Sequence, residues 1–458
     1  MAFCTNKELK SKTIYSIYVR NHSSQGDFSG VLTDLDRIKD LGVDIIWLLP
    51  IHPIGVKNKK GTLGCPYSIS DYRDVNPEYG TLDDFKKLIN GVHERGMKLM
   101  IDVVYNHTSH DSILVKEHPE YFYKKIDGKM GNKCGDWTDI VDLDYANKEL
   151  WEYQLKTLRY WAELGIDGVR CDVASLVPLE FWEEAREQIN AINPKFIWLA
   201  ETVHTSFLKE FRLNGFVAHS DSEMYNQFDI TYDYDTHGFF TDYFENKGKL
   251  SELIYHKSLQ ELIYPQNYIK LRFLENHDQL RSAFFIKDRD TLFNWNAFMF
   301  FENGTPLIYA GQETLNKNTP SLFEKEVIDL EVKDKSYYEF LRKLIAMKKK
   351  SKIFTEGIYD IINHGEDGFV EALYKESDGE NDVERYVLGI FNLDGSKNKK
   401  QLSFFKYLKD LGHSFLDEKF NGRYENMIDG KLVEIYNGTV AFAELPAVLE
   451  FEVKANEK

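Results

Sequence analysis

Short apolar runs rich in β-branched residues alternate with amphipathic helical stretches along most of this chain. That rhythm is typical of a parallel sheet wrapped by helices. The sixth run is included mainly to complete the set, because the surrounding segment is polar and aromatic without clear alternation. The pattern predicts an α/β fold of the (β/α)8 TIM-barrel type, with strands over residues 13–19, 45–49, 98–104, 166–171, 196–200, 228–231, 270–274 and 306–310.

Capping residues and apolar faces predict the helices between these runs. Thr81 and Asp84 form a capping-box pattern, which marks a helix start. Apolar side chains then recur at helical spacing, so that one face can pack against the sheet. The first face comprises Phe85, Leu88, Ile89 and Val92, and a second comprises Trp151, Leu155, Leu158 and Ala162.

Two segments break the rhythm. Residues 107–145 form a long stretch rich in Gly, Asp, Lys and aromatics, and such a long loop is usually functional or a small domain of its own. After a helix around 338–350, short strands such as 385–392 and 440–451 are separated by Gly, Asn and Asp turns, which indicates antiparallel β structure. We therefore predict a catalytic barrel over 1–106 and 146–352, an inserted domain over 107–145 and a C-terminal β-sandwich domain over 353–458.

Charge narrows the choice of partners. The 458 residues carry 57 Lys and Arg against 74 Asp and Glu, a formal net charge of -17, which disfavours nucleic acid and anionic membranes. A neutral sugar is indifferent to that charge. The chain begins without a basic stretch followed by an apolar run, and no apolar stretch is long enough to span a bilayer, so we expect a cytoplasmic protein.

The cysteines carry little information. Those at positions 4, 65, 134 and 171 show neither CxxC spacing nor the density of a disulfide framework. We expect reduced thiols. No His and Cys pair has the ligand spacing of a zinc site on one element.

Polar clusters lie at the carboxyl ends of four predicted strands. Barrel enzymes carry their chemistry at those ends, so a polar cluster there indicates catalysis. Three carboxylates from three different strands would converge on one mouth. The clusters are DVVYNHT with Asp102, Asn106 and His107, GVRCDVAS with Arg170 and Asp172, WLAETVH with Glu201 and His204, and FLENHDQLR with Asn276, His277 and Asp278.

These four segments resemble, in order and spacing, the four motifs of glycoside hydrolase family 13, the α-amylase family. Four motifs at successive strand ends are very specific, whereas one alone would be weak. The resemblance implies a retaining glycosidase that hydrolyses α-1,4-glucosidic bonds in maltooligosaccharides, starch or glycogen through a covalent glycosyl-enzyme intermediate. Further similar segments are DIIWLLPIHP, GCPYSISDYRDVNPEYGT, IVDLDY and GTPLIYAGQE.

Cleaving an acetal needs a proton on the leaving oxygen and a partner for the developing oxocarbenium charge, hence two facing carboxyl groups. The resemblance implies that Asp172 is the nucleophile, kept ionised by Arg170 two residues earlier on the same strand face. Glu201 would be the general acid and then the base, which requires a raised pKa in the free enzyme. Asp278 would bind ring hydroxyls of the sugar at the cleavage site.

The resemblance also implies a set of sugar contacts. His107 and His277 would hydrogen-bond the sugar at the cleavage site, Tyr67 would stack under its ring, and His204 would touch the leaving-group glucose. Asp102 and Arg170 belong with these substrate-binding residues, although Asp102 and Asn106 could instead serve loop architecture. Each residue alone could have a purely structural role. An isolated Arg-x-Asp is more often an ion pair, and a lone Asn-His-Asp is more often a capped turn. Coincidence at four sites in register with the barrel is very improbable.

Departures from the family pattern bear on metal and specificity. Ser175 and Leu176 stand where many calcium-dependent α-amylases have a Lys-His pair, and the NHSSQGDFSG loop lacks the alternating oxygen ligands of a calcium loop. We predict no essential metal or other cofactor, with Ca2+ open because Asn106 sits where a calcium ligand often sits. The DLD ending of the third loop resembles the α-amylase version of its motif, whereas NHDQ resembles the oligo-1,6-glucosidase version, so bond preference stays open.

Several other functions remain open. The same scaffold can act as an α-glucosidase or oligo-1,6-glucosidase, or can pass the glycosyl group to a sugar hydroxyl as a transglycosylase or rearrange it as an isomerase. A catalytically silent carbohydrate-binding homologue would be expected to lack one of the three carboxylates, and all three are present. The expected location favours maltodextrins or glycogen as substrates. Endo or exo action, chain-length preference and oligomeric state are left open by the sequence.

Overall fold

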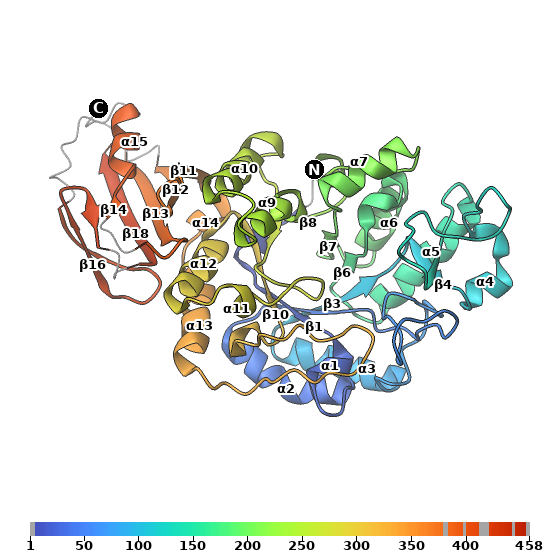
Figure 1. The fold of residues 1–458 in the computed structure, drawn as a ribbon. Coiled ribbons are helices and arrows are strands. Elements are labelled where there is room, and N and C mark those ends of the chain that lie inside the picture. The colour runs from blue at the N-terminus through green and yellow to red at the C-terminus, as the bar shows by residue number, and fades with distance from the viewer. Residues whose placement is uncertain (1–4, 379–382, 397–399, 412–420, 442–444, 455–458) are drawn as a thin grey trace.

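The computed structural model describes residues 5–378, 383–396, 400–411, 421–441 and 445–454. Its centre is a closed parallel barrel in the order β1-β10-β9-β8-β7-β6-β3-β2, closed where Ile14 on β1 pairs with Leu307 on β10 (Figure 1). All eight predicted strands are confirmed, the sixth included. They are β1 Ile14–Ile17, β2 Ile45–Leu48, β3 Lys98–Val103, β6 Gly168–Cys171, β7 Ile197–Ala200, β8 Ile230–Tyr232, β9 Lys270–Arg272 and β10 Gly304–Tyr309.

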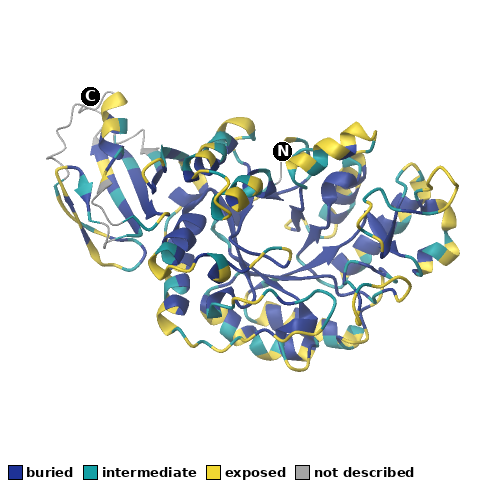
Figure 2. Cartoon of the chain, viewed as in Figure 1, coloured by how far each residue is buried: buried dark blue, intermediate teal, exposed yellow. Residues whose placement is uncertain are grey.

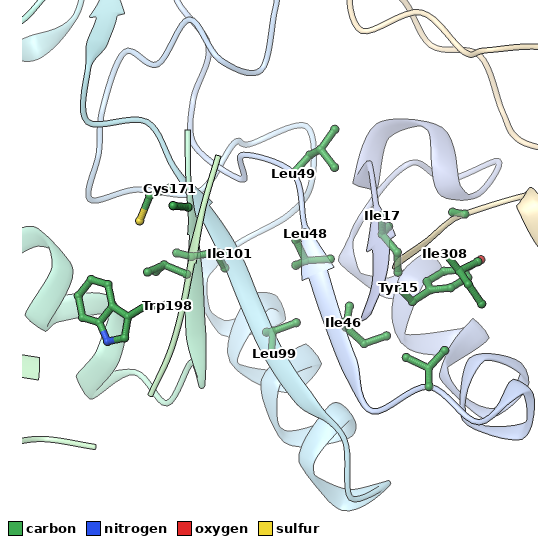
Figure 3. Packing of buried hydrophobic residues seen from close by; sticks show 14 of the residues in the cluster. Tyr15, Ile17, Ile46, Leu48, Leu49, Leu99, Ile101, Cys171, Trp198 and Ile308 are labelled. Atoms are coloured by element: carbon green, nitrogen blue, oxygen red, sulfur yellow. The ribbon is translucent and has the colours of Figure 1, made fainter. Parts of the chain in front are cut away.

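The barrel strands are buried on both faces, as parallel strands covered by helices should be (Figure 2). On β2, Ile45 and Trp47 belong to a cluster that takes alternate residues from most barrel strands and fills the interior. Ile46 and Leu48 point the other way and pack in the layer between strands and helices (Figure 3). This alternation decides which side chains can reach the barrel mouth.

Helices surround the barrel. The capping box predicted at Thr81 is present, since its side chain accepts from the Asp84 amide while the Asp84 carboxylate accepts from the Thr81 amide. The longer helices are α2 Phe28–Leu41, α3 Leu82–Glu94, α5 Lys148–Glu163, α6 Leu179–Asn190, α7 Thr205–Leu213, α9 Tyr234–Phe244, α10 Leu250–Ile263, α12 Arg289–Phe301 and α13 Lys335–Lys350. Short helices are α1 Val19–His22, α4 Ile113–Glu117, α8 Asp221–Met224, α11 Ser282–Phe285 and α14 Ile353–Glu356. None of the helices in the described ranges is both long and apolar enough to cross a membrane.

The segment between β3 and α5 carries its own small sheet. Strand β4, His107–Ser109, pairs antiparallel with β5, Ile140–Asp142, and α4 lies between them in the chain. This unit projects from the barrel on the side away from the C-terminal strands (Figure 1). The predicted inserted segment therefore has secondary structure of its own.

The C-terminal part consists of two antiparallel sheets, in the orders β11-β12-β13-β18 and β14-β17-β16-β15. One apolar cluster draws on both sheets and on α15, Phe404–Asp410, a helix that the sequence analysis did not predict. The single strand expected over 440–451 is wrong, because its two ends lie in different sheets, and residues 442–444 fall outside the described part. The strands are β11 Ile358–His364, β12 Phe369–Asp378, β13 Val383–Asn392, β14 Lys400–Gln401, β15 Gly422–Glu425, β16 Leu432–Tyr436, β17 Thr439–Val440 and β18 Ala447–Lys454.

Candidate active site

Strand alternation brings the polar clusters together inside the barrel mouth. On β3, Met100 lies in the interior cluster, so Asp102 two residues later faces inward as well. The same step leads from Leu199 on β7 to Glu201 just beyond its end. Arg170 on β6 pairs in register with Asp102, so both side chains lie at the same level of the barrel.

One guanidinium organises three carboxylates. Arg170 Nη1 donates to Asp102 Oδ1 and to Asp172 Oδ1, both at 2.9 Å. Arg170 Nη2 lies 2.9 Å from Glu201 Oε1, as an ion-pair contact without the alignment of a hydrogen bond. The Arg170 side chain has no exposed surface, so a single positive charge faces three acidic groups away from water. The cluster carries an excess of potential negative charge.

A strained turn links the end of β6 to Glu201. The Val173 amide donates to Glu201 Oε2 at 2.7 Å. Val173 adopts φ 36° and ψ 43°, a left-handed conformation that is rare for a β-branched residue. Such strain persists where the surrounding structure enforces it and is often found at functional sites. Here it directs an N–H at the carboxylate of Glu201 immediately after Asp172.

The three carboxyl groups around Arg170 have raised pKa values. Burial is the largest cause and raises the pKa of Asp172 to about 7, that of Glu201 to about 7 and that of Asp102 to about 6, while Arg170 opposes the shift in each case. The raised pKa of Glu201 agrees with the acid role predicted for it. The expectation that Arg170 alone keeps Asp172 ionised is incomplete, because the same guanidinium also serves two other carboxylates.

Asp278 sits in a contrasting environment at the rim. Its Oδ2 lies 3.1 Å from His277 Nε2, and its side chain is 39% exposed. Burial acts to raise the pKa of Asp278, but the neighbouring His277 outweighs it and lowers that pKa, while Asp278 raises the pKa of His277. The Tyr67 hydroxyl lies 2.7 Å from His277 Nε2 and donates to Asp102 Oδ2 at 3.1 Å. Asp278 therefore stays ionised where a sugar hydroxyl can reach it.

A cavity of about 500 Å3 opens over this cluster. Most predicted site residues line it: Tyr67, His107, Asp172, Glu201, His204, His277 and Asp278. Asp102 and Arg170 are fully buried and are not among its lining residues, which differs from the sugar contact predicted for them. Arg170 donates to the carboxylates of Asp102 and Asp172, and Asp102 also accepts from the Tyr67 hydroxyl. Asp102 and Arg170 therefore fix the side chains at the floor of the cavity.

Other lining residues were missed by the sequence analysis. Trp137 from the inserted segment lies against His107, with ring centroids 5.5 Å apart, and also against Phe207 on α7 at 6.0 Å. Tyr234 stacks on His204 at 4.4 Å. These aromatics lie outside the four strand-end motifs, and only the aromatic content of the inserted segment hinted at Trp137.

The polar side chains around Asn106 are hydrogen-bonded to one another or to the backbone. The Asn106 amide nitrogen lies 3.2 Å from His107 Nδ1 and donates to Asp142 Oδ1 at 3.4 Å, while Asp142 Oδ2 accepts from the Lys133 amide at 2.7 Å. Ca2+ takes 6–8 oxygen ligands. Leu176, which stands where many calcium-dependent α-amylases have part of a Lys-His pair, is buried in an apolar cluster. No group of three or more His, Cys, Asp or Glu side chains in the described part of the chain is placed to hold a metal.

Comparison with known proteins agrees with this geometry. The pattern of the family described as alpha amylase, catalytic domain, matches residues 13–138 and 132–335. The chain belongs to the alpha-amylase family. That result confirms the predicted membership of glycoside hydrolase family 13 and the predicted barrel.

Two solved structures cover nearly the whole chain. An alpha-amylase from Lactobacillus plantarum is 41% identical, with a TM-score of 0.86 over 98% of this chain and 100% of that one. A noncanonic maltogenic alpha-amylase, AmyB from Thermotoga neapolitana, is 34% identical, with a TM-score of 0.84 over 97% and 100% of the two chains.

Curated relatives are longer than this chain. The intracellular maltogenic amylase of Bacillus subtilis is 28% identical over 352 residues, which are 72% of this chain and 56% of that protein. Alpha-amylase 2 of Dictyoglomus thermophilum is 27% identical over 379 residues, 77% of this chain and 63% of that protein. The chain thus spans less than two thirds of the length of these relatives.

Proposed function

We propose that this protein hydrolyses α-1,4-glucosidic bonds of maltooligosaccharides, starch or glycogen with retention of configuration. The observation that carries the proposal is the placement of Asp172 and Glu201 on the two terminal nitrogens of one buried guanidinium, at the floor of the cavity. Two carboxyl groups held this near each other suit a double displacement, in which one attacks and the other transfers a proton.

The reaction proceeds in two steps. An oxygen of Asp172 attacks the anomeric carbon while Glu201 gives its proton to the glycosidic oxygen, so the C–O bond breaks and the aglycone leaves as an alcohol. Glu201, now ionised, takes a proton from a water molecule that attacks the same carbon. The ester bond to Asp172 breaks, and both residues return to their starting forms.

Each step makes demands on the charge state. Asp172 has to be ionised and Glu201 protonated when substrate binds, and burial raises the pKa of each carboxyl to about 7. The rate should therefore fall on both sides of neutrality. Asp278 would bind ring hydroxyls of the sugar under attack, and Tyr67, His107 and His277 would surround that sugar.

Supporting evidence comes from relatives named as amylases. The L. plantarum protein is called an alpha-amylase, and the T. neapolitana protein a maltogenic alpha-amylase. The relative from B. subtilis is called intracellular, which supports our proposal of a cytoplasmic site of action. We also propose that the reaction needs no metal, because the donors around Asn106 are already engaged with one another. Activity should survive dialysis against EDTA.

A second candidate is glucan transglycosylation on the same scaffold. Trp137 and Phe207 both line the cavity, so their rings offer apolar faces on which an acceptor sugar can stack. An acceptor held there would compete with water for the glycosyl-enzyme. Products longer than the substrate would identify this activity.

The proposal is tested with maltoheptaose, with pullulan and an isomaltooligosaccharide alongside. Proton NMR should show the α-anomer of the new reducing end first, and chromatography should show maltooligosaccharide products that an Asp172→Asn variant does not make. Initial release of the β-anomer would contradict retention. Cleavage of the isomaltooligosaccharide alone would favour an oligo-1,6-glucosidase.

A further inference from the structure

The two ends of the cavity are built differently. Because Glu201 protonates the leaving oxygen in the proposed reaction, the residues that follow it, such as His204 and Phe207, lie on the aglycone side. Tyr67 and Asp278 then mark the glycone side. The cavity is also lined by Cys65, two residues before Tyr67 in the loop after β2, and by Phe323 in the loop after β10.

These two loops follow the strands on either side of β1, and hydrogen bonds join them in what we call the glycone seam (residues 60–64 with 322–324). The Leu63 amide donates to the Phe323 carbonyl at 3.1 Å. The Thr62 amide donates to Glu324 Oε1 at 2.7 Å, and the Thr62 hydroxyl donates to the other Glu324 oxygen. Backbone and side chain together make this a continuous junction.

A buried arginine supports the seam from below. Arg20, 1% exposed, donates through Nη1 to the carbonyls of Gly64 at 3.1 Å and Leu322 at 3.3 Å, one on each side of the junction. The other guanidinium nitrogens bind Glu78. A buried charged group with its hydrogen bonds satisfied is costly to disrupt, so the two loops are held at a fixed separation.

The loops approach too closely to leave a passage between them. Gly61 has φ +65°, and a Cβ atom there would lie 2.5 Å from the Phe323 Cβ. On the adjoining side, Lys60 Nζ lies 3.1 Å from Asp139 Oδ1 and donates to the Asp136 carbonyl at 3.3 Å, which ties the same loop to the inserted segment. Asp139 is itself buried.

We propose that the glycone seam closes the cavity beyond the sugar under attack, so that the enzyme acts from the non-reducing end of the glucan. The inference rests on the proposed function. A cavity of about 500 Å3 bounded in this way holds a short terminal piece of a chain, whereas an endo-acting enzyme needs a groove open at both ends. Soluble maltooligosaccharides with free non-reducing ends are then the substrate class.

The test compares maltoheptaose with maltoheptaose whose non-reducing glucose carries a 4,6-O-ethylidene block, with products resolved by chromatography. A chain with a blocked end can be cut internally but cannot enter a closed glycone pocket. We expect the wild-type protein to cleave the blocked chain at least about tenfold more slowly than the free one, which corresponds to roughly 1.4 kcal/mol. Equal cleavage of both would overturn the inference. Cleavage of neither would refute the proposed function and this inference with it.

A variant then locates the barrier. Thr62→Ala with Glu324→Ala removes the side-chain part of the seam at exposed positions and should raise the ratio of blocked to free cleavage severalfold. Lys333→Gln is the matched control, because Lys333 follows in the same loop but pairs with Asp329 and Glu331; its ratio should equal that of the wild type. An unchanged ratio in the active seam variant would show that the seam is not the barrier.

Discussion

Two buried arginines in this molecule lie in clusters with different ratios of acidic to basic side chains. Arg170 in the barrel mouth faces three carboxylates, those of Asp102, Asp172 and Glu201. Arg272 points outward from β9 and contacts Asp233 at 3.0 Å and Glu302 at 3.4 Å. A second cation completes that outer cluster, since Lys257 lies 2.6 Å from the Asp233 carboxylate and 2.9 Å from that of Glu302.

The difference in balance shows in the titration of the carboxylates. Burial acts to raise the pKa of Asp233, but Arg272 and Lys257 outweigh it and lower that pKa below its usual range. At the barrel mouth burial wins, and the pKa of Asp172 rises to about 7. A matched cluster stays ionised and holds elements together, whereas an unmatched one keeps a proton that can be moved near neutral pH.

The largest effect should come from Asp172→Asn. The variant removes the proposed nucleophile, and we expect kcat on maltoheptaose to fall by about 10³-fold or more. Unfolding monitored by circular dichroism should show no loss of stability at pH 7, because the change removes excess charge. An Asp172→Gly variant with added azide provides the control: formation of a β-glycosyl azide would show that the missing group is a nucleophile, and retained activity in Asp172→Asn would contradict the assignment.

Asp233→Asn should instead lower stability and leave activity nearly unchanged. It leaves Arg272 and Lys257 buried with less negative charge, and we expect the free energy of unfolding in urea to fall by about 3 kcal/mol. Activity per folded molecule should stay near that of the wild type, because Asp233 is not among the residues lining the cavity. A large loss of kcat with unchanged stability would contradict the assignment of a structural role to the Asp233 cluster.

The pH dependence of stability should separate the clusters as well. A carboxyl whose folded pKa is raised stabilises the folded state most below its unfolded pKa, near 4, and loses that contribution as the pH rises through about 7. Asp172→Asn lacks this loss, so its stability relative to the wild type should grow between pH 5 and 8, by an amount on the order of 1 kcal/mol. For Asp233 the sign is opposite, since its contribution is lost in acid. A pH-independent difference for Asp172→Asn would contradict the raised pKa.

The smallest effect is expected at the surface. Asp329 and Lys333 form an exposed ion pair in the loop after β10. Asp329→Asn should leave the free energy of unfolding in urea unchanged within the error of the measurement, because exposed pairs gain little in water. The same urea titration measures this variant. A loss of unfolding free energy as large as that of Asp233→Asn would mean that burial does not determine how much an ion pair contributes to stability.

Much of this arrangement could be predicted because it follows from strand alternation. Asp102 and Glu201 lie two residues beyond the interior residues Met100 and Leu199, and Arg170 and Asp172 alternate with Val169 and Cys171, which pack in the outer layer, so strand alternation turns all four toward one mouth. The sixth strand could be placed only by completing the set. Here β8 is held by its neighbours β7 and β9 more than by any apolar alternation of its own.

The walls of the cavity could not be predicted in the same way. Trp137, Phe207 and Phe323 come from loops and a helix start, where the period of the sequence no longer fixes direction. The raised pKa of Asp172 depends on how many carboxylates share Arg170, which is a property of the assembled site. The break between β17 and β18 was missed because a continuous β-rich run can belong to two sheets.

The pairing of β1 with β10 has a bearing on how the molecule is made. Ile14 meets Leu307, so the ring of strands closes only after most of the polypeptide has left the ribosome. Pairing of residues so distant in sequence is slow to form. Asp172 and Glu201 are translated well before that moment, yet they lack a walled chamber until the last strand arrives. The candidate site of the nascent chain is therefore incomplete until β10 pairs with β1, and the onset of catalytic activity during synthesis would report ring closure directly.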